Sequence, residues 1–225
     1  MLGSIEEMAA LVRKSHILVL SGGFSLGDEP DGSAKFIVNV LNAPKVAEAI
    51  HGLLDRGGLI LGICNGFQAL VKSGLLPYGR LGKVSKSSPT LFRNDLNRHI
   101  SPMVRTRAGT VNSPWLSGFT VGEEHVIAVS HGEGKFVVSD AVARELFDNG
   151  QVAFQYVDEE GLPTMESPQN PNGSLFAIEG IISRDGQILG KMGHTERYEG
   201  NLFRNIGGNK VQDIFGNAIR YFRKS

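Results

Sequence analysis

The sequence contains a single cysteine, Cys64, and this scarcity excludes several classes of protein. One cysteine cannot form an internal disulfide, which fits a reducing, cytoplasmic setting, and it excludes a zinc site built on several thiolates. Basic and acidic residues number 23 each, so the chain has no net charge to attract nucleic acid or an anionic membrane. It also lacks an apolar run of roughly 18 residues, the length of a membrane-spanning helix, and the apolar segment of a signal peptide.

What remains is an ordinary globular composition, 41% apolar and 20% charged, in a chain of 225 residues that suits one large domain. The first half predicts helices and short buried strands in alternation. The helices are expected at 4–14, 42–58 and 66–74, and the strands at 16–23 and 59–64. This alternation indicates an α/β fold with a parallel sheet flanked by helices.

The second half has a different pattern, with short apolar or alternating runs between turn signals. Strands are expected at 125–131, 134–139, 152–158 and 174–183, and a closing helix at 213–222. These strands predict an antiparallel addition beside the parallel core. No linker or internal repeat divides the chain, so residues 1–225 are interpreted as one domain.

Cys64 lies in a G-x-C-x-G motif, residues 62–66, between an expected strand and an expected helix. This is the thiol form of the nucleophile elbow, in which a sharp turn presents the side chain above the edge of a sheet. The glycines at 62 and 66 leave room for the turn, and the helix N-terminus should favour the thiolate. The alternative is a structural cysteine buried at a strand end. Gln68 follows one helical turn later, so its amide can face the same cleft.

A thiol nucleophile needs a base, and His194 is the first candidate because Glu196 lies two residues further on. On an extended segment both side chains would face the same side, so Glu196 could orient the imidazole. His131, in the glycine-rich stretch SHGEGKF, is the rival base. The amide N–H groups of Asn65 and Gly23 are candidate donors to an oxyanion. A phosphate-binding interpretation of residues 22–28 is weak, because no Lys-Ser/Thr pair follows.

Several blocks occur in collinear order, and together they resemble one family. The blocks are LSGGFSLGDEPDGSAKFI, LILGICNGFQALVKSGLLPYG, PTLFRNDLNRHIS, SHGEGKF, NPNGS and GHTERY. They are similar to the glutaminase domain of phosphoribosylformylglycinamidine synthase, a triad (class I) glutamine amidotransferase. The resemblance implies a flavodoxin-like, mostly parallel open sheet with added antiparallel strands. It also implies that glutamine is hydrolysed and its ammonia passed to an ATP-dependent synthetase of purine biosynthesis.

The resemblance gives each matching position an expected role. Cys64 matches the nucleophile, His194 the base and Glu196 its orienting partner, while Gly23 and Asn65 match the oxyanion donors. Gly22, Gln68, Ser130 and His131 match the region that contacts glutamine. Many relatives read His-Pro-Glu where this chain reads His-Thr-Glu, which keeps the spacing of the two side chains.

The resemblance also implies which components lie elsewhere. No metal or cofactor is expected in this domain, because ATP and Mg²⁺ belong to the synthetase domain, on the same or a companion polypeptide. Relatives carry a further strand and helix upstream, so this chain resembles the C-terminal part of a larger synthetase whose first strand is missing. The alternatives are a free-standing cysteine hydrolase with the same elbow, and a non-catalytic docking module. The Cys64, His194 and Glu196 set favours the amidotransferase.

Overall fold

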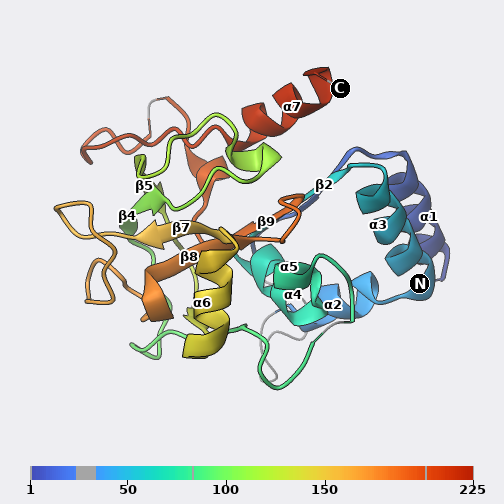
Figure 1. Cartoon of the computed structure of the whole chain (residues 1–225), viewed down its shortest axis with the longest axis horizontal. Helices are drawn as coiled ribbons and strands as arrows, with labels where there is room; N and C mark the ends of the chain where they lie inside the picture. Colours follow the sequence, from blue (N-terminus) through green and yellow to red (C-terminus); the bar gives the residue numbers. More distant parts are fainter. Residues whose placement is uncertain (1, 24–33, 83, 201, 225) are drawn as a thin grey trace.

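The computed structural model describes residues 2–23, 34–82, 84–200 and 202–224, which form one mixed α/β structure (Figure 1). The helices are α1 Leu2–Lys14, α2 Lys35–Leu41, α3 Pro44–Asp55, α4 Asn65–Ser73, α5 Leu75–Tyr78, α6 Asp140–Asp148 and α7 Ile214–Lys224. Short 3₁₀ turns are η1 Pro114–Leu116, η2 Leu175–Ala177 and η3 Thr195–Arg197. The strands are β1 Ile17–Leu20, β2 Leu59–Ile63, β3 Thr90–Arg93, β4 Met103–Ala108, β5 Glu124–Ala128, β6 Glu133–Val137, β7 Val152–Tyr156, β8 Ile178–Ile182 and β9 Ile188–Lys191.

Among the described residues, seven strands form one sheet in the order β1-β2-β9-β8-β7-β4-β5. β1, β2 and β9 are parallel, whereas every later pair in this order is antiparallel. The expected α/β class, a parallel part with added antiparallel strands, is confirmed, although the antiparallel part is larger than the sequence indicated. The reason lies partly in the tight turn at Gly186, whose φ of 76° lets β8 and β9 form a hairpin.

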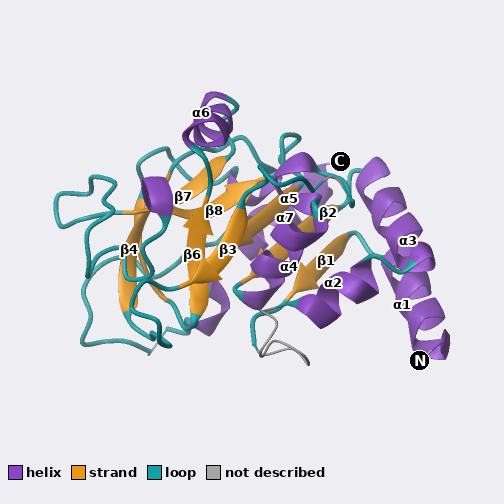
Figure 2. Cartoon of the chain, turned by 90° about the horizontal axis from the view of Figure 1, so that it is seen from below, coloured by secondary structure: helices purple, strands orange, loops and turns teal. Residues whose placement is uncertain are grey.

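The helices cover the sheet unevenly. α1 and α3 lie side by side at the end of the sheet that holds β1 and β2, while α6 lies beside β7 and β8 (Figures 1 and 2). β3 and β6 pair as a separate antiparallel ribbon, and β3 contacts α4. This arrangement covers the parallel strands from more than one side, which explains why all five residues of β2 are buried.

Each helix and strand expected from the sequence is present, but some elements were not expected. β3, β4, β9, α2, α5 and α6 had no separate prediction. In β4 the residues alternate between partly exposed and buried, with Arg105 and Arg107 on the more exposed face and Val104 and Thr106 buried. The two arginines obscure the apolar pattern in the sequence, so only pairing with β5 and β7 reveals the strand.

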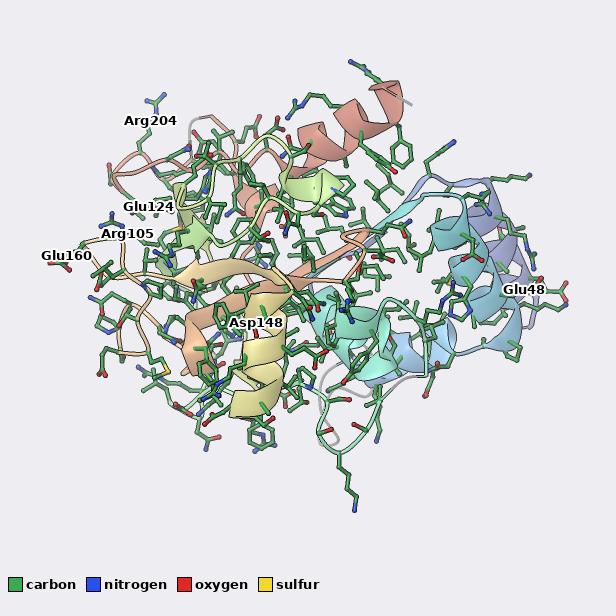
Figure 3. All side chains as sticks on the ribbon, in the orientation of Figure 1. Glu48, Arg105, Glu124, Asp148, Glu160 and Arg204 are labelled. Atoms are coloured by element: carbon green, nitrogen blue, oxygen red, sulfur yellow. The ribbon has the colours of Figure 1, made fainter. Side chains whose placement is uncertain are left out.

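Charged side chains gather on the outside of the molecule. Glu48, Glu160 and Arg204 project from its rim, and Arg105 and Glu124 lie close together where β4 and β5 pair (Figure 3). A guanidinium nitrogen of Arg105 lies 2.6 Å from a carboxylate oxygen of Glu124. Such half-exposed pairs contribute little to stability, so the fold depends on its apolar core.

Some expectations cannot be compared with the structure. Residues 24–33, most of the first block that supports the family resemblance, lie outside the described residues. β1 forms one edge of the described sheet, and a further strand ahead of it stays a prediction. None of the helices among the described residues is both long and apolar enough to cross a membrane.

Candidate active site

Cys64 occupies the sharp turn between β2 and α4, as the motif predicted. Its φ of 52° and ψ of −108° are a strained combination for a residue with a side chain. A Cβ on Gly66 would lie 2.0 Å from the carbonyl oxygen of Leu20, and one on Gly62 would lie 2.7 Å from the Gly66 carbonyl. The two glycines therefore allow the turn to pack against β1 and against itself. Strain held in this way is typical of functional sites.

His194 reaches the same edge of the sheet because it follows β9, the parallel neighbour of β2. Ile63 pairs with Lys191 in the register of these strands, and the N–H of Cys64 donates to the carbonyl of Lys191 at 2.8 Å. The N–H of His194 donates to the carbonyl of Ala128 at 2.7 Å, which anchors the backbone of His194 to the end of β5. The carboxyl ends of parallel strands thus bring residues 64 and 194 together.

Gly22 lies close to the side chains of both Cys64 and His194. A Cβ built on Gly22 would lie 2.7 Å from Cε1 of His194 and 3.2 Å from Cβ of Cys64. The end of β1 therefore packs against both residues at once, and no side chain fits between them at this position. This places Gly22 in the site itself, where its backbone can contact a substrate.

Glu196 contacts His194, although by a different local geometry from the one expected. Nδ1 of His194 lies 2.6 Å from a carboxylate oxygen of Glu196. The segment is not extended: residues 195–197 form the turn η3, and His194 precedes it. Burial would raise the pKa of Glu196, but the hydrogen bond and the charge interaction with His194 outweigh this and hold that pKa below its usual value. Nε2 of His194 is buried and has no protein partner among the described residues.

The thiol of Cys64 is buried, and this burial favours its protonated form. Only 6% of the residue is exposed. Burial raises the pKa of Cys64 to about 11, although hydrogen bonds from the N–H groups of Asn65 and Gly23 and the positive charge of Arg197 lower it. The N–H of Asn65 at the start of α4 favours the thiolate, as expected, but desolvation is the larger effect and keeps the thiol protonated. The thiol lies 3.6 Å from the carbonyl of Ser130 and can donate to it.

Asn65 and Gly23, the two expected oxyanion donors, both direct their N–H groups at the sulfur of Cys64. Asn65 is the first residue of α4, where backbone N–H groups have no partner within the helix. Gly23 has a φ of 126°, which a residue with a side chain rarely adopts. Two N–H groups converge beside the thiol, an arrangement that can bind a negatively charged oxygen.

Gln68, Ser130 and His131 lie around the site, but their side chains already have partners. Gln68 is buried, and its amide nitrogen donates to the carbonyl of Glu133 rather than facing an open cleft. The hydroxyl of Ser130 lies 3.1 Å from Nε2 of His99. The loop at 130–133 is thus tied to α4 and lies directly against the thiol.

His131, the rival base, is held in a different way. Its Nδ1 lies 3.1 Å from the side-chain oxygen of Asn94, and its ring packs on Gly134, which has no room for a side chain there. Burial and the nearby His194 lower the pKa of His131 to about 3, so the ring is neutral at physiological pH. No carboxylate among the described residues orients it, which favours His194 as the base.

Three features that shape this site were not expected from the sequence. They are the carbonyl of Ser130 beside the thiol, the charge of Arg197 near it, and a buried ion pair of Lys191 with Glu179 behind His194. A lysine within the apolar run QILGKMG was a signal that could have been noticed. The two other features come from backbone position and spatial proximity, which leave no mark in the sequence.

Comparisons with known proteins agree with this geometry. The model of the CobB/CobQ-like glutamine amidotransferase domain matches residues 2–223. The chain is 33% identical, over 90% of its length and 78% of the relative's, to phosphoribosylformylglycinamidine synthase subunit PurQ of Gloeobacter violaceus. It is 37% identical, over 90% and 80%, to the protein of the same name from Koribacter versatilis.

Solved structures are similar as well. The structure of PurLQS from Thermotoga maritima is 28% identical, with a TM-score of 0.67 over 92% of this chain and 80% of that one. A GMP synthase-type protein from Thermoplasma acidophilum is 15% identical, with a TM-score of 0.54 over 98% and 82%, and shows the same fold. With its strained cysteine turn and the adjoining histidine and glutamate, the chain belongs to the CobB/CobQ-like glutamine amidotransferase family.

Proposed function

We propose that this chain is the glutaminase of a phosphoribosylformylglycinamidine synthase. It hydrolyses the side-chain amide of glutamine and supplies ammonia for the conversion of formylglycinamide ribonucleotide to formylglycinamidine ribonucleotide. The observation that carries the proposal is the convergence of Cys64, the His194–Glu196 pair and two backbone N–H groups at one sheet edge. The PurQ relatives supply the substrate class and the pathway.

The first half-reaction follows from this geometry. The sulfur of Cys64 attacks the amide carbon of glutamine, while Nε2 of His194 accepts the thiol proton. The N–H groups of Asn65 and Gly23 stabilise the negative oxygen of the tetrahedral intermediate. The carbon–nitrogen bond then breaks, His194 returns the proton to the departing nitrogen, and ammonia leaves a thioester on Cys64.

Water completes the cycle. His194 takes a proton from a water molecule, whose oxygen attacks the thioester, and the sulfur leaves with that proton as glutamate forms. The high pKa of Cys64 makes the base essential, because little thiolate exists near pH 7 without it. Glu196 holds the imidazole by Nδ1, which leaves Nε2 for the thiol. Gly22, Gln68, Ser130 and His131 form the surroundings in which glutamine binds.

The ammonia has to reach a second active site. Replacing the amide oxygen of formylglycinamide ribonucleotide by nitrogen requires ATP and Mg²⁺, which the synthetase partner binds and this chain does not need. The Thermotoga assembly named PurLQS supports such a partner. A reducing cytoplasm suits the free thiol of Cys64. A free-standing cysteine hydrolase is the alternative, and the PurQ relatives disfavour it.

The test separates the two half-reactions in the complete enzyme. Cys64→Ala should abolish glutamine-dependent synthesis, because the thioester cannot form, and leave synthesis from added ammonium salts intact. Formation of formylglycinamidine ribonucleotide from each nitrogen donor is measured. Loss of both activities in a folded variant would instead place Cys64 in the core or at the interface with the synthetase.

A further inference from the structure

A buried ion pair lies directly behind the base. Glu179 is in β8 and Lys191 ends β9, and these strands are antiparallel neighbours. The ammonium nitrogen lies 3.5 Å from a carboxylate oxygen, and neither side chain has any exposed surface. Two charges are costly to bury, so a pair of this kind needs an explanation beyond stability.

The contacts of the pair surround the peptide groups on either side of His194. The ammonium of Lys191 donates to the carbonyl of Gly193 at 2.8 Å and to the hydroxyl of Thr195 at 3.1 Å. The carboxylate of Glu179 accepts the N–H of Gly193 at 2.5 Å. One ion pair thus satisfies both backbone groups of the residue before His194 and the side chain of the residue after it.

The packing leaves no room for a side chain at Gly193. A Cβ on Gly193 would lie 2.8 Å from the carboxylate oxygen of Glu179 and 2.9 Å from the ammonium of Lys191. On the other side, the hydroxyl of Thr195 donates to the side-chain oxygen of Gln212 at 2.7 Å. The chain from Gly193 to Thr195 is therefore held at two points, with the imidazole of His194 between them.

The charge of Lys191 also acts on the catalytic carboxylate. Burial lowers the pKa of Lys191, and the negative charges of Glu179 and Glu196 oppose that shift. In return the positive charge of Lys191 is one of the interactions that lower the pKa of Glu196. Removing Lys191 would weaken the ionised state of the group that orients His194.

We propose that Glu179 and Lys191 are positioning residues, which lock the backbone around His194 so that its ring stays aligned between Glu196 and Cys64. The inference rests on the proposed function, because it concerns the alignment of the base in that reaction. The hydrogen bonds of the pair run to Gly193 and Thr195, so it acts on His194 through this backbone segment and, by the charge of Lys191, through Glu196.

The experiment uses the chain in complex with its synthetase partner and compares Lys191→Met, Glu179→Gln and the double variant Glu179→Leu/Lys191→Met. Arg80→Met is the matched control, because Arg80 forms an exposed ion pair with Asp55 away from the site. Glutaminase kcat and KM, the melting temperature and the rate of Cys64 alkylation by iodoacetamide at a fixed pH are measured.

Each single variant should lower kcat by up to about 100-fold, the effect of a base displaced by about an ångström, and leave KM nearly unchanged. The double variant is the decisive one. It should melt at or above the temperature of either single variant, because no charge is left buried without a partner, yet kcat should stay low. Arg80→Met should match the unmodified enzyme.

Two results would overturn the inference. One is an unchanged kcat in the single variants or a restored kcat in the double variant. The other is a double variant that does not fold, which would make the pair structural. Alkylation of Cys64 needs no glutamine, so it keeps the test separate from the proposed function. If the unmodified enzyme hydrolysed no glutamine, the proposed glutaminase function would fail. The positioning role of Glu179 and Lys191 would then be supported only if their variants slowed the alkylation of Cys64 as much as His194→Ala does.

Discussion

At the residue scale, the thiol of Cys64 lies beside the N–H groups of Asn65 and Gly23 and is also buried from water. A free cysteine in water has a pKa of about 8.5, whereas burial raises that of Cys64 to about 11. The folded protein therefore keeps the thiol protonated across the physiological range. Catalysis then depends on the base, which links the reactivity of residue 64 to the placement of residue 194.

The raised pKa predicts a specific pH dependence. Because only the thiolate reacts with iodoacetamide, the alkylation rate of Cys64 should be low near pH 7 and rise through pH 9 towards about 11. Cys64 is the single cysteine of the chain, so the mass of the alkylated chain reports this residue alone. Cys64→Ala is the control. A rate that already levels off near pH 8 would show that burial does not govern the thiol.

His194 and Glu196 should act as one unit. His194→Ala should lower glutaminase kcat by about 10²- to 10⁴-fold, because the thiol loses the group that accepts its proton. Glu196→Gln should be milder, since Glu196 acts through Nδ1 of His194. The double variant should be no worse than His194→Ala. Losses that add up in the double variant would indicate independent roles, and His131 would then be tested as the base.

At the element scale, the elbow depends on how closely α4 approaches β1. Gly66 is the first-turn residue of α4 that meets the carbonyl of Leu20, and Gly22 at the end of β1 meets the ring of His194. The three parallel strands β1, β2 and β9 are neighbours in the sheet, and each is followed by part of the site. The glycines Gly22 and Gly23 follow β1, Cys64 follows β2 and His194 follows β9. This arrangement explains why the parallel part of the sheet carries the chemistry.

Gly66→Ala tests this close approach. The added methyl would lie 2.0 Å from the carbonyl oxygen of Leu20, so the backbone of β1 or α4 must move, at a cost of about 1–3 kcal/mol. The melting temperature and the denaturation midpoint should both fall. Gly207→Ala is the matched control, because its methyl would meet no atom within 4 Å. Equal stability of the two variants would contradict the packing described for the turn.

At the scale of the whole molecule, the side chains around the site are buried or already hydrogen-bonded among the described residues. The thiol is 6% exposed, Gln68 is engaged with the loop at 133, and His131 is buried beside Asn94. The carbonyl of Ser130 lies beside the thiol, so access of glutamine to Cys64 depends on the position of the 130–133 loop. We expect the proposed synthetase partner to shift this loop towards a more open position.

The partner should consequently raise the glutaminase rate. Addition of the synthetase with its nucleotide substrates should increase kcat for glutamine hydrolysis by about tenfold or more, equivalent to about 1.4 kcal/mol in the barrier. Glutamate release is measured with and without the synthetase, and His194→Ala serves as the inactive control. An isolated chain that hydrolyses glutamine as fast as the complete enzyme would contradict this coupling.

The sequence by itself determined the features that depend on neighbouring residues. The G-x-C-x-G turn requires small residues two positions on either side of Cys64, so the elbow could be read directly and the structure contains it. The helix and strand periodicity indicated α1, β1, α3, β2, α4 and α7 for the same reason. Each of these depends on short-range sterics or on a repeating apolar face, which a single sequence displays.

Only the tertiary structure decided the features that depend on burial and on distant strands. The pairing of β8 with β9 brings Glu179 to Lys191, and no spacing rule connects these residues. The helix N-terminus was expected to favour the thiolate, and the N–H of Asn65 does lower the pKa of Cys64, but the surrounding packing removes water and raises that pKa by more. Glu196 reaches His194 through a 3₁₀ turn rather than an extended segment. Desolvation and long-range contacts are properties of the packed chain, so they arise only when all the elements are in place.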